Sequence, residues 1–162
     1  MHGPEPTMEG IMTVWTQFEA LHASGKVGQL GISNCYDYNT FLGLYQLANV
    51  KPTVLQNRFY SDAGYDKQLR QFCRQENIKY QSFWTLTANP QILMHPLMRK
   101  ISEKYSKTPA CIFFRALVQM GITPLTGTSS AIHMEQDLEV AQGKFELEES
   151  DVGVISNLIN LY

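Results

Sequence analysis

The chain has few cysteines, no long apolar run and no surplus of positive charge. Its three cysteines, Cys35, Cys73 and Cys111, show no CxxC or Cys/His spacing, so we expect neither a disulfide framework nor a metal site. No apolar stretch approaches the ~18 residues of a membrane span, and the first residues lack the basic and apolar regions of a secretory signal. We therefore expect a protein of the reducing cytoplasm that has no contact with membranes.

The charged residues are mixed along the chain rather than gathered in a block. Lys and Arg number 13 and Asp and Glu number 15, which gives a formal net charge of −2. Proteins that bind nucleic acid need a cluster of cations to neutralise phosphates, and the chain has none. Nucleic acid is not an expected partner. With 162 residues, 44% of them hydrophobic, we expect one globular domain over residues 1–162.

The spacing of apolar residues predicts alternating strands and helices. Apolar residues recur every three or four positions from Met8 to Ala23, which indicates a leading helix. Strands are predicted over residues 27–33, 53–57, 78–83 and 123–126. Further helices are predicted from about residue 38, from about residue 66, over 97–105, 109–120 and 130–142, and from 148 onward. This order is typical of parallel βα repeats.

Four βα units are half of an eight-stranded (β/α)8 TIM barrel, which needs about 250 residues. The partial barrel is one prediction, and an open, doubly wound sheet of four parallel strands is the alternative. Periodicity does not separate them. A half-barrel leaves two strand edges open, and open edges pair with other chains. We therefore expect completion of the barrel by a homodimer or by pairing with a paralogue.

Polar and aromatic residues stand where the first three predicted strands end. Ser33 and Asn34 close the first strand, Gln56 ends the second and Phe83 ends the third. Ligands of parallel βα proteins bind outside the carboxyl ends of the strands, so this placement favours a planar, amide-bearing ligand such as nicotinamide. The alternative for Ser33 and Asn34 is a purely structural role as caps of the following helix.

Four segments together resemble one known family, the aldo-keto reductases. Residues 25–34, GKVGQLGISN, resemble the family signature GKVxxxGxSN, and Gln56 and Phe83 follow in the family's order. Residues 108–115, TPACIFFR, are similar to the family's TxAQVxLRW helix, and residues 125–137 occupy the place of its IPKSxxxxRIxEN motif. The resemblance implies the carboxyl-terminal half of a (β/α)8 barrel that reduces aldehydes and ketones with NADP(H) and without a metal.

The resemblance also implies roles for the residues at the strand ends. Ser33, Asn34 and Gln56 align with the groups that bind the nicotinamide carboxamide. Phe83 aligns with the aromatic residue, usually Tyr, that stacks on the nicotinamide ring, and stacking needs only the aromatic face. The alternative for Phe83 is a core aromatic. Trp84 and Leu86 are candidates for lining the same pocket, although a Trp at a strand end also packs against neighbouring helices.

At the nucleotide end the chain departs from the family. Gly127, Thr128 and His133 stand where the family has Lys, Ser and Arg around the 2′-phosphate, and charge-assisted contacts are the strong ones. Gln136 and Asp137 stand in place of the Glu and Asn that contact adenine, or else belong to an exposed helix face. We expect weak cofactor binding, and either NADP(H) or NAD(H) as the cofactor.

The family catalyses with an Asp, a Tyr, a Lys and a His, and only the His has a counterpart in these residues. Residues 1–4 resemble the end of the family's fourth strand, which makes His2 the candidate catalytic residue. The alternative is a mobile terminal histidine. We expect a chain truncated at its amino-terminal side and inactive alone toward carbonyl substrates. The alternative function is a non-catalytic interaction or regulatory half-barrel.

Overall fold

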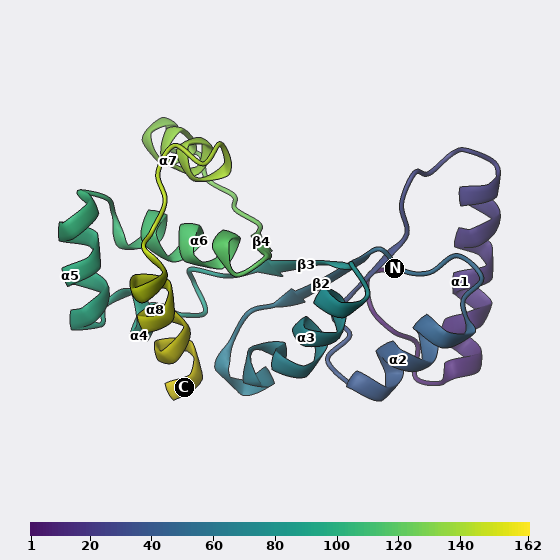
Figure 1. Cartoon of the computed structure of the whole chain (residues 1–162). Helices are drawn as coiled ribbons and strands as arrows, with labels where there is room; N and C mark the ends of the chain where they lie inside the picture. The colour runs from purple at the N-terminus through teal and green to yellow at the C-terminus, as the bar shows by residue number, and fades with distance from the viewer. The chain divides into compact units, whose positions relative to one another are not determined.

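The computed structural model describes all 162 residues and confirms the predicted alternation of strands and helices (Figure 1). The strands are β1 Gly31–Ser33, β2 Val54–Arg58, β3 Lys79–Phe83 and β4 Ile122–Pro124. The helices are α1 Met8–Ala23, α2 Tyr38–Leu47, α3 Lys67–Gln75, α4 Pro90–Leu93, α5 Pro96–Tyr105, α6 Pro109–Gln119, α7 Ala131–Ala141 and α8 Glu149–Leu161, with a 3-10 helix η1 at Ser61–Asp66. Helix α4 and η1 were not predicted. No helix has both the length and the apolar character needed to cross a membrane.

The strands lie in the same order in the sheet as in the sequence. They form one parallel sheet, β1-β2-β3-β4, in which Ile32 of β1 is paired with Leu55 of β2. A doubly wound sheet reverses its winding direction at a switch point, and this order has no reversal. The doubly wound alternative is therefore wrong. Successive crossovers that step in one direction are those of a barrel, and the partial (β/α)8 barrel is confirmed.

The first strand is shorter than predicted, because residues 27–30 lie outside β1. The ladder begins where the Thr53 N–H donates to the Leu30 carbonyl at 2.9 Å. The residue before Thr53 is Pro52, which has no N–H and cannot extend the ladder backward. Inside β1 the two strands approach closely. A Cβ atom at Gly31 would lie 2.8 Å from the Val54 carbonyl oxygen, so this position requires glycine.

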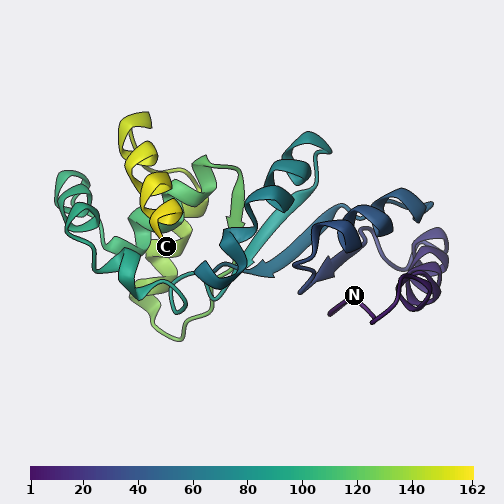
Figure 2. The same ribbon diagram turned by 90° about the horizontal axis from the view of Figure 1, so that it is seen from below.

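The chain divides into two compact units, and unit 1 comprises Met1–Arg58 and Asp66–Gln81. Within unit 1, α1 and α2 pack side by side (Figure 1, Figure 2). Trp15 of α1 is fully buried, and its indole N–H donates to the Val50 carbonyl at 3.0 Å. The Glu19 carboxylate accepts hydrogen bonds from the N–H groups of Asn49 and Val50 at 2.7 and 2.9 Å. Helix α1 is thus anchored at the start of the segment that leads into β2.

Unit 2 comprises Phe59–Tyr65 and Ser82–Tyr162, and it is built around α6. Every residue of α6 from Cys111 to Leu117 is buried, because α5, α7, α8 and β4 all pack against this helix. The buried side chains therefore lie on all sides of α6 and not along a single stripe. Arg115 is the one charged residue among them, and its guanidinium contacts Glu146 at 3.2 Å. Pro109 occupies the first turn of α6, as predicted.

Candidate functional site

In unit 1, three of the predicted site residues lie together where β1 ends beside β2. Gln56 does not end its strand as predicted, because β2 continues to Arg58, but the register pairs it with Ser33. The Ser33 hydroxyl donates to the Gln56 carbonyl at 2.7 Å, and the Asn34 N–H donates to the same carbonyl oxygen at 3.0 Å. Asn34 has a φ of 54°, in the left-handed region that Asn tolerates better than most residues. The Asn34 side-chain amide and the Ser33 hydroxyl contact each other at 3.3 Å. The predicted juxtaposition of these three residues is therefore present.

The side-chain amides of this cluster are engaged within the protein. The Asn34 Nδ2 group donates to the His2 carbonyl at 2.7 Å and to the Ser33 hydroxyl at 3.3 Å. The Tyr36 hydroxyl contacts Asn34 Oδ1 at 3.4 Å. Gln56 Nε2 donates to Gln81 Oε1 at 2.8 Å, whereas Gln56 Oε1 accepts no hydrogen bond. The contacts of Asn34 with the Ser33 and Tyr36 hydroxyls, at 3.3 and 3.4 Å, are long, so a ligand amide can replace them at low cost.

The backbone of the first two residues lies beside β1. The Met1 nitrogen donates to the Gly31 carbonyl at 2.7 Å, and the Ser33 N–H donates to the Met1 carbonyl at 2.9 Å. Bonds to residues 31 and 33 from one residue are the pattern of a parallel ladder. Met1 thus fills the position of a preceding strand. The His2 backbone is held by Asn34, while the His2 residue as a whole is exposed.

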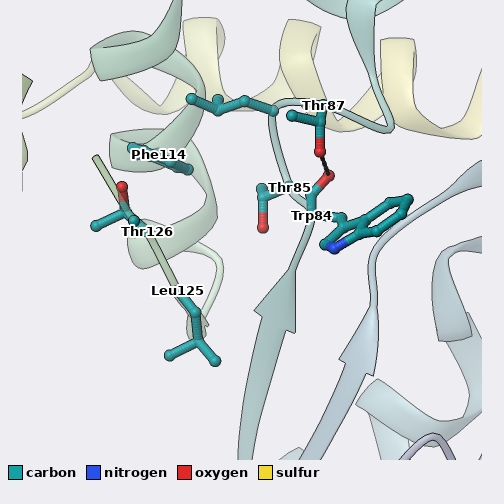
Figure 3. A pocket seen from close by; sticks show the side chains of 8 residues that line it. Trp84, Thr85, Thr87, Phe114, Leu125 and Thr126 are labelled. Atoms are coloured by element: carbon teal, nitrogen blue, oxygen red, sulfur yellow. Dashed lines mark hydrogen bonds between the residues drawn. The ribbon is translucent and has the colours of Figure 1, made fainter. Parts of the chain in front are cut away.

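In unit 2, the residues after β3 line a cavity of about 400 Å³. Trp84, Leu86 and Gly127, which were predicted as cofactor-binding residues, are among its walls. Thr85 lies between Trp84 on one side and Phe114 and Thr126 on the other (Figure 3). The Thr85 hydroxyl donates to the Ser82 carbonyl and hydroxyl, at 3.1 and 2.9 Å, and thereby fixes the turn that carries Trp84. Phe83 ends β3 as predicted, is partly buried, and is not among the cavity walls.

The remaining predicted residues lie on or just before α7. The Thr128 hydroxyl accepts from the Ser130 N–H at 3.1 Å, and Ser130 in turn caps α7 by accepting from the His133 N–H at 3.4 Å. His133 is exposed. The Asp137 carboxylate is held by the Thr126 hydroxyl at 2.8 Å. Gln136 lines a different cavity, of about 260 Å³.

The cavity that contains Gln136 is lined by charged residues of both signs. Lys107, Glu135 and Glu139 are among its walls. The Lys107 ammonium and the Glu139 carboxylate form an ion pair at 2.6 Å, and the Lys107 side-chain hydrogen bond lowers the pKa of Glu139. Thr108 and Cys111 of the α6 amino terminus complete one side. The cavity therefore presents more carboxylate than cation.

No family model matches the chain, but individual proteins do. It is 29% identical over 161 residues to the probable NAD(P)H-dependent D-xylose reductase xyl1 of Emericella nidulans, covering 91% of this chain and 49% of that protein. It is 25% identical over 153 residues to the glyoxal reductase of Bacillus subtilis, covering 94% of this chain and 54% of that protein. The chain spans about half the length of these curated relatives.

Solved structures show the same fold over almost the whole chain. The structure of Gox0644 in its apo form matches with a TM-score of 0.85 and 26% identity, covering 98% of this chain and 56% of that one. MGS-M4, an aldo-keto reductase enzyme from a Medee basin deep-sea metagenome library, matches with a TM-score of 0.85 and 23% identity, over 98% of this chain and 57% of that one. The chain is related to the aldo-keto reductases. The resemblance seen in the sequence is thus confirmed.

Three residues that the sequence did not mark as site residues contact the predicted ones. Gln81 pairs with Gln56, and Tyr36 contacts both Asn34 and, at 3.1 Å, the Arg58 N–H. Thr85 fixes the Trp84 turn. For Gln81 a signal was available, because it is two residues before Phe83 and therefore on the same face of β3. No comparable pattern marks Tyr36, which lies in the irregular segment between β1 and α2.

Proposed function

We propose that these 162 residues are the nicotinamide-binding part of an NAD(P)H-dependent aldo-keto reductase that acts on aldehydes or ketones. The observation that carries the proposal is the cluster of Ser33, Asn34 and Gln56 where β1 ends beside β2. The names of the relatives support it, because one is an NAD(P)H-dependent reductase and a mutant of Gox0644 is described in complex with NADPH.

The polar groups of the cluster fit a carboxamide. A carboxamide offers a carbonyl oxygen that accepts and an NH2 group that donates. Asn34 Nδ2 is a donor, the Ser33 hydroxyl oxygen can accept because its proton is given to the Gln56 carbonyl, and Gln56 Oε1 is an acceptor without a partner. A ligand amide that bonds to both sides is held in one orientation, and an aromatic ring attached to it is then fixed in direction. In the proposed function these three residues orient the nicotinamide ring.

Taken by itself, the cavity of unit 2 offers hydroxyl and backbone groups that can bind phosphate oxygens. Thr87, Thr126 and the Gly127 backbone are among its walls, and no Lys or Arg is. Hydroxyl and backbone groups bind phosphate oxygens, but they contribute less than charge-assisted contacts. The proposed cofactor is therefore NADP(H) or NAD(H), bound weakly and without strong preference for the 2′-phosphate.

Bound NAD(P)H supplies the hydride for carbonyl reduction. These residues contribute orientation of the ring, and the buried Asp66 carboxylate is engaged by Asn57 and Tyr80 instead of facing the carbonyl oxygen of a substrate. His2 is the only residue that the family resemblance assigns to catalysis, and it is exposed. A correctly placed general acid contributes about 10²- to 10⁴-fold to the rate. We propose that the 162 residues alone bind cofactor without appreciable turnover.

The test is a fluorescence titration with NADPH and with NADH, comparing two Asn→Gly variants. Asn34→Gly removes the side-chain amide while keeping a residue that tolerates a φ of 54°. Asn77→Gly is the matched control, because Asn77 has a φ of 55° and lies in the same unit, after α3. We expect Asn34→Gly to weaken binding about tenfold, as loss of a hydrogen bond pair does, and Asn77→Gly to leave it unchanged.

Two outcomes would contradict the proposed function. The first is that the folded wild-type chain shows no saturable binding of either nucleotide. The second is that both glycine variants weaken binding equally, since the effect would then follow from general loosening of unit 1. Circular dichroism of each variant establishes that the comparison is made between folded proteins.

A second candidate function, an interaction module, is favoured by the surface of α7. Met134 and Leu138 are exposed there, at 47% and 55%. They lie on the side of α7 that carries Asp137 and Ala141, next to an apolar cavity of about 380 Å³ between α6, β4 and α7. Exposed apolar groups beside a groove are typical of a contact surface. We propose a second copy of this chain as the partner.

The strand edges themselves offer little to such a partner. Met1 already bonds to the outer edge of β1, and β4 has only three residues, ending at Pro124. Proline and short length are both features that prevent strand addition. Association is therefore expected through the α7 surface. Leu138→Lys should weaken it in light scattering, whereas Leu161→Lys, at an exposed leucine of α8, should not. A purely monomeric wild-type chain at all concentrations would exclude this function.

A further inference from the structure

A buried asparagine occupies a position of β2 where the barrel pattern calls for an apolar side chain. In β2, Leu55 and Asn57 are buried and their neighbours are half-buried, so these two side chains share the buried face. Both have an exposed fraction of 0%. A buried amide is tolerated only when its donors and acceptor are bonded. The bonds that Asn57 makes therefore indicate why an amide is present.

The Asn57 side-chain amide forms hydrogen bonds with both the N–H and the carbonyl of Cys35. Asn57 Oδ1 accepts from the Cys35 N–H at 3.0 Å, and Asn57 Nδ2 donates to the Cys35 carbonyl at 2.8 Å. A side-chain amide bonded in this way replaces a piece of β ladder beyond the point where β1 ends at Ser33. The chain after β1 is thus attached to β2 although it has left the strand conformation.

The residue held between these attachments is Asn34. Its own N–H donates to the Gln56 carbonyl, and the N–H of the next residue, Cys35, is bonded to Asn57. The peptide groups on both sides of Asn34 are therefore bonded to consecutive residues of β2. Asn34 has a positive φ, a conformation that costs free energy for a residue other than glycine and needs surrounding contacts to persist.

A buried carboxylate fixes which way the Asn57 amide points. Asp66 Oδ2 accepts from Asn57 Nδ2 at 2.7 Å and from the Tyr80 hydroxyl at 2.8 Å. Because Asp66 Oδ2 accepts both of these hydrogen bonds, it selects the rotamer in which Asn57 Nδ2 faces Asp66 and Oδ1 faces the Cys35 N–H. Asp66 reaches this place because Tyr65 and Asp66 both have left-handed backbones at the end of η1.

We propose that Asn57 is a positioning residue for Asn34, with Asp66 setting the orientation of the Asn57 amide. Asn57 does not touch the ligand. It acts by holding the turn in which Asn34 presents its amide, and its effect is therefore confined to the carboxamide end of the ligand. This inference rests on the proposed function, because the ligand amide is the group that Asn34 is proposed to bind.

The test compares binding of NADPH with binding of ADP-ribose, which lacks the nicotinamide ring. In Asn57→Leu the volume is nearly kept and all three amide contacts are lost. We expect NADPH binding to weaken about tenfold and ADP-ribose binding to stay unchanged. Glu19→Gln is the matched control, because Glu19 is another buried polar residue of unit 1 that binds backbone N–H groups, at Asn49 and Val50. It should move neither affinity.

Hydrogen exchange supplies a readout that needs no ligand. We expect the Cys35 amide proton to exchange faster in Asn57→Leu than in the wild type, while the Ile32 amide proton inside β1 keeps its protection. If Asn57→Leu fails to fold, Asp66→Asn provides the same comparison. It removes the carboxylate and leaves Asn57 in place. We therefore expect a selective loss of NADPH affinity that is smaller than the loss in Asn57→Leu.

The outcomes separate the two proposals. If the wild type binds neither NADPH nor ADP-ribose, the proposed function is wrong, and the exchange data still decide whether Asn57 holds the Cys35 turn. If the wild type binds both and the folded Asn57 variant binds NADPH as tightly as the wild type, the positioning role is wrong. Equal loss of both ligands in Asn57→Leu would also overturn it, since the effect would then be general.

Discussion

Lys107 and Glu139 form an ion pair at 2.6 Å on the wall of the cavity that contains Gln136. The Lys107 ammonium also lies 5.2 Å from the centre of the Phe145 ring. Lys107 is the one cation on this wall, and Glu135 adds a second carboxylate to it. The family resemblance assigns Gln136 to the adenine end of the cofactor. A phosphate near it would have to compete with Glu139 for the Lys107 ammonium, and it would meet Glu135 without compensation.

Glu139→Gln should therefore shift nucleotide preference toward NADPH. The substitution releases the Lys107 ammonium for a phosphate, and we expect the ratio of NADPH to NADH affinity to rise several-fold at low salt. Glu135→Gln removes the same charge from the same cavity without releasing Lys107, so its effect should be smaller. Titrations of both nucleotides against all three proteins measure these ratios. A wild-type chain that strongly prefers NADPH would contradict this description of the cavity.

Glu19 is expected to make the stability of the chain sensitive to acid. Burial alone would raise the pKa of Glu19, but the hydrogen bonds from Val50 and Asn49 outweigh it and hold the pKa below its ordinary value. A lowered folded-state pKa stabilises the fold above the unfolded value of about 4.3, and the contribution disappears as pH falls through the folded-state pKa. Glu19→Gln should cost about 1–3 kcal/mol at pH 7 and less in acid.

Urea unfolding of Glu19→Gln at a series of pH values measures this difference directly. Glu9→Gln is the control, because Glu9 is on the same helix and exposed. Its free energy of unfolding should stay within about 0.5 kcal/mol of the wild type at every pH. If the two variants lose equal stability at pH 7, the Glu19 hydrogen bonds do not contribute as the geometry indicates.

The positions of Ser33 and Asn34 could be predicted from the sequence because they close a strand with a clear pattern. Gln56 was predicted to end the next strand; it lies inside β2, and the register pairs it with Ser33. Parallel strands end at the same edge, so adjacent strands bring the residues near their ends together. The hydrogen bond between Ser33 and the Gln56 carbonyl is the direct result. The order of strands and helices along the chain also followed from the βα repeat. The order of the strands within the sheet, which separates a barrel from a doubly wound sheet, needed the resemblance or the structure.

The Asn57 and Asp66 pair could not be predicted in the same way. The two residues are separated by η1, whose left-handed Tyr65 and Asp66 have no periodic signal. Met1 beside β1 was equally hidden, because a single residue that completes a ladder has no pattern of its own. Asp137 shows the opposite difficulty. Its family position suggested a ligand contact, but in the structure its carboxylate bonds to Thr126.

The three cysteines are expected to react slowly in the folded chain. All are buried, and burial raises the pKa of Cys35 and of Cys73 to about 12. Because the thiolate is the reactive form, both burial and protonation slow attack on a thiol reagent. A dithiobis-nitrobenzoate titration should find almost no fast thiol in the native protein and all three after unfolding in guanidinium. One rapidly reacting thiol in the native chain would show that a part of the core opens readily.

The chain alone should not turn over carbonyl substrates, whatever its affinity for cofactor. Hydride transfer to a ketone leaves an alkoxide that must receive a proton. The buried Asp66 carboxylate is linked to the cluster of Ser33, Asn34 and Gln56 only through Asn57, and it is already bonded to Asn57 and Tyr80. His2 is exposed and is attached through its backbone carbonyl to Asn34, so its imidazole is not fixed within the ~0.5 Å that catalytic geometry requires. NADPH consumption with a panel of aldehydes measures turnover, and His2→Ala is the comparison. We expect both proteins to match the background rate. Turnover by the wild type that disappears in His2→Ala would show that the imidazole is positioned after all, and these residues would then be catalytic on their own.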